Sequence, residues 1–284
     1  MSAKRRKLSK KIIFLIVAGA IISVIALTCI GLEIAFVVAD NNIECWHPDY
    51  EQQNIYPILN KEQLSDEDYE TLYAQTGLTK IGVDRMKKRG SVGISRILAI
   101  QREYFAEHEV INNFYAPFLC TDKIDGTSTF TYLENGDIIV SSSTHLSGWR
   151  MGHAGLVTDA DEGKILQANA VTEKSKLGTI RDFNDRVNFL VLSPKADTAL
   201  KAEVCKYAEE NLTGKTYDPT AGVFLSKSKA DRTQCAHLVW HAYDKFGLDL
   251  DSNGGLVVTP KDIAGSPFVE LVQVFGFDPD KLWK

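Results

Sequence analysis

The sequence predicts an α+β protein that follows one N-terminal membrane-spanning helix. Ile12 to Leu32 is a run of 21 residues without a charge. Helical and strand patterns then occupy separate stretches of the chain, which is typical of α+β folds. The 284 residues are 44% hydrophobic and 24% charged, an ordinary composition for a folded protein of one or two domains.

The apolar segment is long enough to cross a membrane as a helix. At about 1.5 Å per residue, 21 residues span the roughly 30 Å hydrocarbon core, and the run continues past Glu33 to Val38. A helix in a protein core would carry a polar stripe, and this one carries none. We expect a spanning helix at residues 12–38. A cleaved signal peptide is the alternative, although its apolar region is usually only about 7–15 residues.

Charge sets the expected topology. Residues 1–11 contain six cations and no acid: Lys4, Arg5, Arg6, Lys7, Lys10 and Lys11. Such a cluster of cations keeps the N-terminus in the cytoplasm. We therefore expect a single-pass protein of the cell membrane, with residues 1–11 in the cytoplasm and the main domain outside. The rest holds 26 basic and all 37 acidic residues, a balance of −11. Nucleic acid is therefore not an expected partner.

Nucleotide binding and disulfide bonding have little support. The chain contains neither GxxxxGK[ST] nor GxGxxG, so a nucleotide partner is not expected. Four cysteines follow the apolar segment, at wide spacings: Cys45, Cys120, Cys205 and Cys235. Such spacing is not that of a small disulfide scaffold, and a Cys45–Cys120 bridge stays open as an alternative.

A linker and a small helical region precede the main domain. Residues 39–60 are polar and contain Pro48 and Pro57, as a linker does. Three helices are then predicted, at Leu64–Gln75 with a Ser65 cap, from Thr79 to Gly90, and at Ser95–Phe105. We expect residues 61–114 to pack against the main domain without carrying chemistry.

From Thr127 the hydrophobic period becomes two, which indicates strands. Asn135-Gly136 and Asp159–Gly163 are turn signals that predict two hairpins. The predicted strands are Thr127–Leu133, Ile138–Ser143, Gly155–Thr158, Ile165–Val171, Val187–Leu192 and Val269–Phe275. Helices are predicted at Asp197–Asn211 and Gln234–Phe246. Residues 115–284 therefore form the expected main domain.

Cys235 is the first candidate for chemistry, because it opens a predicted helix. Unpaired N–H groups and the positive helix end favour a thiolate there and would lower the thiol pKa. The same N–H groups could bind an oxyanion. A free cysteine is equally often a small buried hydrophobe.

His153 and an amide pair are the other candidates. His153 begins an apolar strand between Gly152 and Ala154-Gly155. Gln167 and Asn169 share one face of the strand predicted to pair with it, so an amide there could orient the imidazole. Structural roles are the alternative for all three side chains.

Two further histidines give no support for a metal. His237 and His241 lie four residues apart on the Cys235 helix, but Leu238 stands where an HEXXH zinc site has glutamate. We therefore expect no metal.

Four segments together resemble a known family: Asn135–Val140, Gly152–Val157, Gly214–Asp218 and Gln234–Val239. Val258–Ala264 with Ser266-Pro267 adds to the likeness. With the histidine strand first and the cysteine helix last, they look like the circularly permuted NlpC-type papain-like cysteine hydrolases, the YiiX/YebB-like family. The resemblance covers roughly residues 115–275.

The resemblance implies a permuted papain-like fold, with an antiparallel sheet and packed helices. Cys235 would be the nucleophile, His153 the general base and Gln167 the orienting residue, with Asn169 as second choice. Tyr217 would line the site. Ala236 and His237 depart from the serine and glutamate that often follow the family cysteine. Thiol catalysis of this kind needs no cofactor.

Three functions follow as expectations. The first is cleavage of amide or peptide bonds in cell-wall peptide (peptidoglycan). The second is lipid acyl hydrolysis or transfer, because the permuted branch also resembles lecithin–retinol acyltransferase-like enzymes. The third is a membrane-tethered binding module without catalysis. An apolar tunnel at Cys235 would favour lipid, and an open polar groove would favour peptide.

Overall fold

The computed structural model describes residues 9–40, 43–115, 119–146, 149–224 and 226–283. The chain forms two compact units. The first comprises residues 1–43 with 147–149, and the second comprises residues 44–146 with 150–284. Most of the predicted basic segment, residues 1–8, lies outside the described residues.

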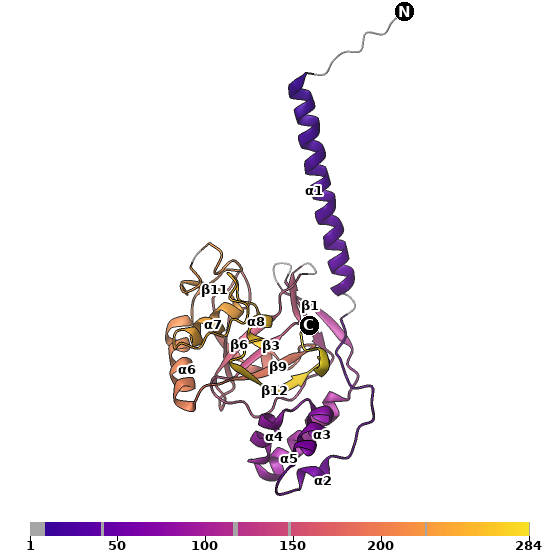
Figure 1. The fold of residues 1–284 in the computed structure, drawn as a ribbon, viewed down its shortest axis with the longest axis vertical. Coiled ribbons are helices and arrows are strands. Elements are labelled where there is room, and N and C mark those ends of the chain that lie inside the picture. Colours follow the sequence, from indigo (N-terminus) through magenta and orange to yellow (C-terminus); the bar gives the residue numbers. More distant parts are fainter. Residues whose placement is uncertain (1–8, 41–42, 116–118, 147–148, 225, 284) are drawn as a thin grey trace, which may run out of the picture. The chain divides into compact units, whose positions relative to one another are not determined.

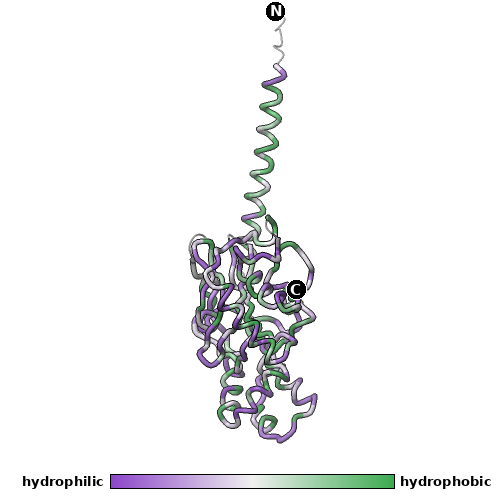
Figure 2. Tube along the Cα trace, turned by 90° about the vertical axis from the view of Figure 1, so that its left-hand side faces the viewer, coloured by the Kyte–Doolittle hydropathy of each residue, from purple (hydrophilic) through white to green (hydrophobic). Residues whose placement is uncertain are grey.

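The first unit contains one long apolar helix, α1 (Lys10–Asp40). Its stretch Lys10–Ala35 has a mean hydropathy of 2.9 and lies unburied in the structure. Figure 2 shows this helix as a nearly continuous hydrophobic tube. Its length and composition suffice to cross a membrane, as a membrane anchor or a signal sequence would.

The second unit is built on an antiparallel six-stranded sheet of order β12-β9-β3-β6-β7-β8. Its strands are β3 (Ile138–Ser141), β6 (His153–Asp159), β7 (Lys164–Gln167), β8 (Lys176–Thr179), β9 (Phe189–Pro194) and β12 (Val269–Phe275). The central strands β3 and β9 are buried throughout. The sequences of such strands are mostly apolar without alternation, because side chains on both faces of the sheet are covered.

Two helices cover the middle of this sheet, α6 (Thr198–Leu212) and α7 (Cys235–Asp244), and both contact β6. The short α8 (Pro260–Ala264) contacts β3. Figure 1 shows these helices beside the sheet. Helix α7 is apolar on nearly all sides, with every residue from Cys235 to Tyr243 buried, so it is the core helix of the unit.

The remaining strands form two smaller sheets. A four-stranded sheet has the order β1-β2-β4-β5, and a parallel pair joins β10 to β11. Their bounds are β1 (Val110–Tyr115), β2 (Leu119–Ile124), β4 (Thr144–Leu146), β5 (Trp149–Arg150), β10 (Thr216–Tyr217) and β11 (Arg232–Thr233). Short 3-10 turns lie at Ile180–Asp182 and Pro279–Lys281. The pattern of alternating residues did not predict these short strands.

A cluster of short helices packs against the edge strand β12. It contains α2 (Tyr56–Leu59), α3 (Asp66–Thr76), α4 (Lys80–Lys87) and α5 (Gly90–Tyr104), which lie together in Figure 1. Gly77 ends α3 at φ +68°, and a Cβ there would lie 2.2 Å from the Val274 carbonyl oxygen. Only glycine allows this approach, in which the Val274 N–H donates to the Gly77 carbonyl at 2.8 Å.

Most predicted elements of the second unit are confirmed, with shifted ends. Ser65 caps α3 in a reciprocal pair with Asp68. The third predicted helix begins earlier than expected, at Gly90. The predicted strand at Ile165–Val171 ends at Gln167. Cys45 is a buried free cysteine, so a bridge to Cys120 is not formed.

The strand predicted at Thr127–Leu133 is wrong, and so is the hairpin that it would form. Residues 127–134 are not in a strand, and β3 pairs with β6 and β9 instead. Side chains satisfy this backbone: the Thr131 N–H donates to Gln273 Oε1 at 2.6 Å, and Gln273 Nε2 donates to the Thr129 carbonyl at 2.8 Å. Alternating residues therefore pack without a ladder of backbone hydrogen bonds.

A buried ion pair joins the helical cluster to the main sheet. From α4, Arg85 donates from Nη1 to Asp137 Oδ2 at 2.5 Å and from Nη2 to Glu134 Oε2 at 2.9 Å. Asp137 is fully buried and Arg85 is 7% exposed. Without Arg85, Asp137 would keep only the longer contact to Lys201, whose Nζ lies 4.0 Å from Oδ1. A buried carboxylate that loses its main cation is poorly compensated for its desolvation.

We therefore expect Arg85→Met to lower the free energy of unfolding by about 3–5 kcal/mol. Urea unfolding of the full chain in detergent, followed by tryptophan fluorescence, measures this loss. Arg102→Met, on the exposed side of α5, is the control and should change stability by less than about 0.5 kcal/mol. Equal effects of the two substitutions would contradict a structural role for the Arg85–Asp137 pair.

Candidate active site

Cys235 is the first residue of α7, and the side chain of Gln234 caps that helix. Gln234 Oε1 accepts from the Ala236 N–H at 2.9 Å and from the Cys235 Sγ–H at 3.4 Å. Its Nε2 donates to the Val258 carbonyl at 2.5 Å. The two ends of the amide are thus fixed, and the cap also holds the thiol in place.

The thiol lies beside the strand that carries His153. Burial raises the pKa of Cys235, while the N–H groups of Ala154 and Ala236 and the charge of Arg186 oppose this rise. The helix start does lower this pKa, as expected, but burial has the larger effect and the net direction is upward. Cys235 is only 6% exposed, and in so dry a position desolvation outweighs the helix end.

His153 is the first residue of β6 and is 3% exposed. Its Nε2 lies 2.9 Å from Gln167 Oε1, and its ring stacks on Phe183 with centroids 5.2 Å apart. Gln167 Nε2 in turn donates to Asp182 Oδ2 at 2.5 Å. Because Asp182 takes the amide N–H, the Gln167 oxygen faces His153 and must accept. We therefore assign the imidazole proton to Nε2, which leaves Nδ1 as the basic nitrogen.

The imidazole is neutral at rest. Burial, helped by the charge of Arg186, lowers the pKa of His153 to about 3, although Gln167 opposes the shift. With the thiol pKa raised and the imidazole pKa lowered, the uncharged pair is the stable form at neutral pH. This differs from the thiolate that the position of Cys235 at a helix start suggested.

Two cavities flank these residues. Cys235 opens to a cavity of about 350 Å³ with a largely apolar wall. Its apolar part includes the side chains of Tyr217, Met151, Pro219, Val257, Val258 and Trp283, and Arg150 and Lys261 also line it. His153 lines a second cavity of about 320 Å³, together with Asn169, Asp182 and Arg186. Cysteine and histidine therefore face separate spaces.

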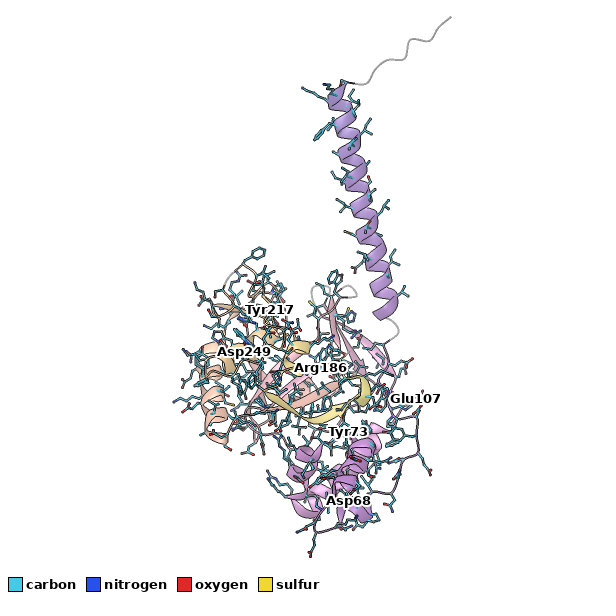
Figure 3. The ribbon with its side chains drawn as sticks, viewed as in Figure 1. Asp68, Tyr73, Glu107, Arg186, Tyr217 and Asp249 are labelled. Atoms are coloured by element: carbon cyan, nitrogen blue, oxygen red, sulfur yellow. The ribbon has the colours of Figure 1, made fainter. Side chains whose placement is uncertain are left out.

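Tyr217 and Asn169, the two expected substrate-contacting residues, lie on different sides of the site. Tyr217 is in β10 and shares the cavity of Cys235; Figure 3 labels it. Asn169 follows the end of β7 and lines the cavity of His153. Its Oδ1 is buried and has no hydrogen-bond partner within the described part of the chain, so it is available to a ligand.

The sequence did not identify three further polar residues of the site: Gln234, Asp182 and Arg186. Asp182 had a detectable signal, because Thr179-Ile180-Arg181-Asp182 fits a capping box, which the structure contains. Gln234 occupies an N-cap position, although glutamine is not among the usual caps. No local pattern distinguishes Arg186, which reaches the site from the loop before β9.

His237 and His241 serve a different purpose. His237 Nδ1 lies 2.9 Å from Thr233 Oγ1, and its Nε2 lies 2.7 Å from the Lys227 carbonyl. His241 Nε2 lies 3.0 Å from the Ser228 carbonyl. Both rings thus hold the loop before β11. Within the described residues no group of three or more His, Cys, Asp or Glu side chains could hold a metal ion.

Comparison with known proteins gives one distant likeness. Over 152 residues, 52% of its length, the chain is 27% identical to the uncharacterized protein YycO of Bacillus subtilis (strain 168). The match spans 58% of that protein, a little over half of its length. No protein-family model matches the chain, and no solved structure matches it.

Proposed function

We propose that this chain is a membrane-anchored, extracytoplasmic thiol hydrolase that cleaves amide or peptide bonds in cell-wall peptide. We further propose that it has the permuted papain-like, NlpC-type fold of the YiiX/YebB-like proteins. The observation that carries the proposal is the chain of hydrogen bonds from Asp182 through Gln167 to His153, beside a cysteine at a helix start. A histidine oriented by an amide next to a cysteine is the arrangement of thiol hydrolases.

In the proposed reaction, Cys235 attacks the carbonyl carbon of the substrate. His153 Nδ1 takes the thiol proton as sulfur bonds to carbon, and the proton then passes to the leaving nitrogen. Water attacks the resulting thioester with the same imidazole as base, which releases the acid and restores the thiol. Gln167 and Asp182 act as positioning residues that keep the ring and its tautomer fixed.

Backbone N–H groups would stabilise the charged intermediate. The N–H groups of Ala154 and Cys235 already act on the sulfur, since both oppose the rise of its pKa, whereas the Ala236 N–H is engaged by Gln234. Donors fixed in a dry site stabilise developing charge without reorganisation. The helix start therefore serves the oxyanion that forms during the reaction more than the resting thiol.

The proposed orientation rests on charge. The six cations of residues 1–11 would keep that end in the cytoplasm, with α1 as an uncleaved anchor. Residues 44–284 would then meet wall peptide or the outer lipid surface. The cytoplasm holds neither wall peptide nor this lipid surface, so orientation limits the substrates.

Lipid acyl hydrolysis or transfer is the second candidate. The apolar wall of the Cys235 cavity favours it, with Met151, Val257 and Val258 in contact with the space that an acyl group would enter. The same chemistry would serve an ester, with His153 protonating an alcohol instead of an amine. Measuring which substrate the protein prefers therefore distinguishes cleavage of amide bonds from hydrolysis or transfer of lipid acyl groups at the same site.

Purified full chain in detergent, given two substrates in parallel, tests the proposal. We expect wall-derived peptides to release new amino groups, while diacyl phospholipid releases little fatty acid. Because both reactions would need Cys235, only release that disappears in Cys235→Ala counts. Fatty acid release alone would favour the lipid reading, and no release from either substrate would favour a binding module without catalysis.

A further inference from the structure

Arg186 is a buried cation at the site that the proposed reaction does not use. It is 8% exposed and lies in the interior of the second unit (Figure 3). Nε donates to the Asp182 carbonyl at 3.1 Å, and Nη1 donates to Ser143 Oγ at 3.0 Å and Thr144 Oγ1 at 2.8 Å. The guanidinium carbon lies 4.8 Å from the centre of the Phe183 ring, the ring on which His153 stacks.

This guanidinium lacks an anionic partner. Every acceptor given above is a neutral oxygen, and among the described residues no carboxylate lies within 4.0 Å of it. Nη2 has no hydrogen-bond partner among these residues. The two acids whose charges act on it are engaged elsewhere: Asp182 accepts from Gln167, and Asp185 pairs with Lys123 at 2.6 Å. A buried cation is costly unless it is paired.

Arg186 lines the 320 Å³ cavity of His153. Two more cations border that cavity, Lys123 and Lys176, although each also pairs with an acid, Asp185 and Glu173 respectively. Asp182 is the one acid among the lining residues. Nη2 of Arg186 is thus the strongest unsatisfied donor of this space, because Nε and Nη1 already donate to the protein. A charged N–H donor of this kind makes a charge-assisted hydrogen bond to a carboxylate oxygen.

We propose that Arg186 binds a carboxylate of the substrate, carried by the leaving group, in the cavity of His153. This inference rests on the proposed function and narrows it to amides whose nitrogen belongs to an amino acid or peptide with a nearby free carboxylate. His153 must reach the leaving nitrogen to protonate it, so the leaving group belongs on the His153 side. The acyl part then occupies the apolar cavity of Cys235.

The neutral resting pair fits this assignment. The charge of Arg186 already opposes an imidazolium at His153. A bound carboxylate would offset that charge and make protonation of His153 easier once substrate is in place. The negative charge of the bound substrate would therefore favour transfer of the thiol proton from Cys235 to His153.

Protection of Cys235 from alkylation tests the inference without a known substrate. Iodoacetamide modifies the full chain in detergent at pH 9, and mass spectrometry follows the Cys235 peptide. N-acetylglycine and N-acetylglycinamide are the two protecting probes, which differ only in a carboxylate against a neutral amide. We expect N-acetylglycine to protect at a concentration about tenfold lower, as one charge-assisted contact provides.

Two variants assign the preference to Arg186. In Arg186→Gln the two probes should protect equally, and in Arg181→Gln the tenfold preference should remain. Arg181 lies in the preceding 3-10 turn and is exposed, and its substitution removes the same charge. If Arg186→Gln fails to fold, Arg186→Lys replaces it and should show a smaller preference than the unmodified chain. The three N–H donors of lysine cannot keep the contacts to Asp182, Ser143 and Thr144 and also reach the ligand.

The outcomes separate the inference from the proposed function. Equal protection by both probes in the unmodified chain, or an unchanged preference in the Arg186 variant, overturns carboxylate binding while hydrolysis can still occur. Glycerol 3-phosphate serves as a third probe. If it protects better than N-acetylglycine, the ligand is a phosphate such as that of a lipid headgroup, and the carboxylate assignment is wrong. Absence of peptide hydrolysis would contradict the proposed function, and the protection experiment would still test carboxylate binding.

Discussion

Cys235→Ala is expected to abolish hydrolysis of the preferred substrate, with a loss of at least about 10³-fold. Without the sulfur no thioester forms, and only binding and the N–H groups remain. Folding should survive, because alanine fills most of the space of a buried cysteine and α7 keeps its Gln234 cap. The rate of product release and the circular dichroism of the full chain measure the two effects.

Cys205→Ala is the matched control. Cys205 is also a buried helical cysteine, 5% exposed, and its Sγ–H donates to the Val157 carbonyl at 3.5 Å. It lies in the core away from either cavity wall, so its loss should leave hydrolysis within about twofold. Full activity in Cys235→Ala would show that the thiol is not the nucleophile.

His153→Asn is expected to lower kcat/KM by about 10³-fold, within the usual range for the loss of a general base. Asparagine can still reach toward Gln167 but cannot take the thiol proton. In the unmodified chain, kcat/KM should be level from about pH 4 upward, because the pKa of His153 is near 3. It should fall below that pH, as protonation of the ring removes the base.

His108→Asn controls for the loss of an imidazole elsewhere in the second unit. His108 lies 3.9 Å from Asp125 and packs edge-on to Phe275, far along the chain from both catalytic candidates. Its substitution should leave kcat/KM and the pH profile nearly unchanged. A similar loss in both variants would mean that His153 acts through stability and not as a base.

Sequence reasoning predicted the contact between His153 and Gln167 because the local signals for it are strong. Cys235 begins a helix, and His153 and Gln167 lie on two strands joined by a short turn, so pairing alone brings them together. In the structure β6 and β7 pair through that turn, and Gly155 lies opposite Gln167. A two-residue offset on one face then lets the longer glutamine reach the ring.

The rest of the site depends on contacts between distant segments. Arg186 comes from the loop before β9, and its partners Ser143 and Thr144 precede it by more than 40 residues. The segment at 127–134 shows the opposite case, where an alternating pattern predicted a strand but Gln273 and other side chains bind its backbone. The hydrophobic period of a sequence indicates which residues are buried. It does not indicate which groups form hydrogen bonds with the backbone.

The direction of the Cys235 pKa illustrates the same point. A helix start favours a thiolate only when the thiol keeps some contact with water, and exposure is set by tertiary packing. Here the thiol is enclosed by α7, β6 and the Gln234 amide, so desolvation prevails. The position of Cys235 at a helix start predicts one contribution to its pKa, which is downward. Burial determines the direction of the net pKa shift, which is upward.

The central claim is that Cys235 is a neutral buried thiol at rest, which His153 deprotonates only as it reacts. Its most direct test is the pH dependence of alkylation of Cys235 by iodoacetamide, with Cys205 as an internal reference whose pKa burial raises to about 11. We expect the Cys235 rate to rise about tenfold per pH unit between pH 6 and 9, with less than about 1% thiolate at pH 7. Cys205 should react more slowly throughout. A level rate from about pH 4 to pH 8 would contradict the claim, because it would show a thiolate–imidazolium pair already formed in the free protein.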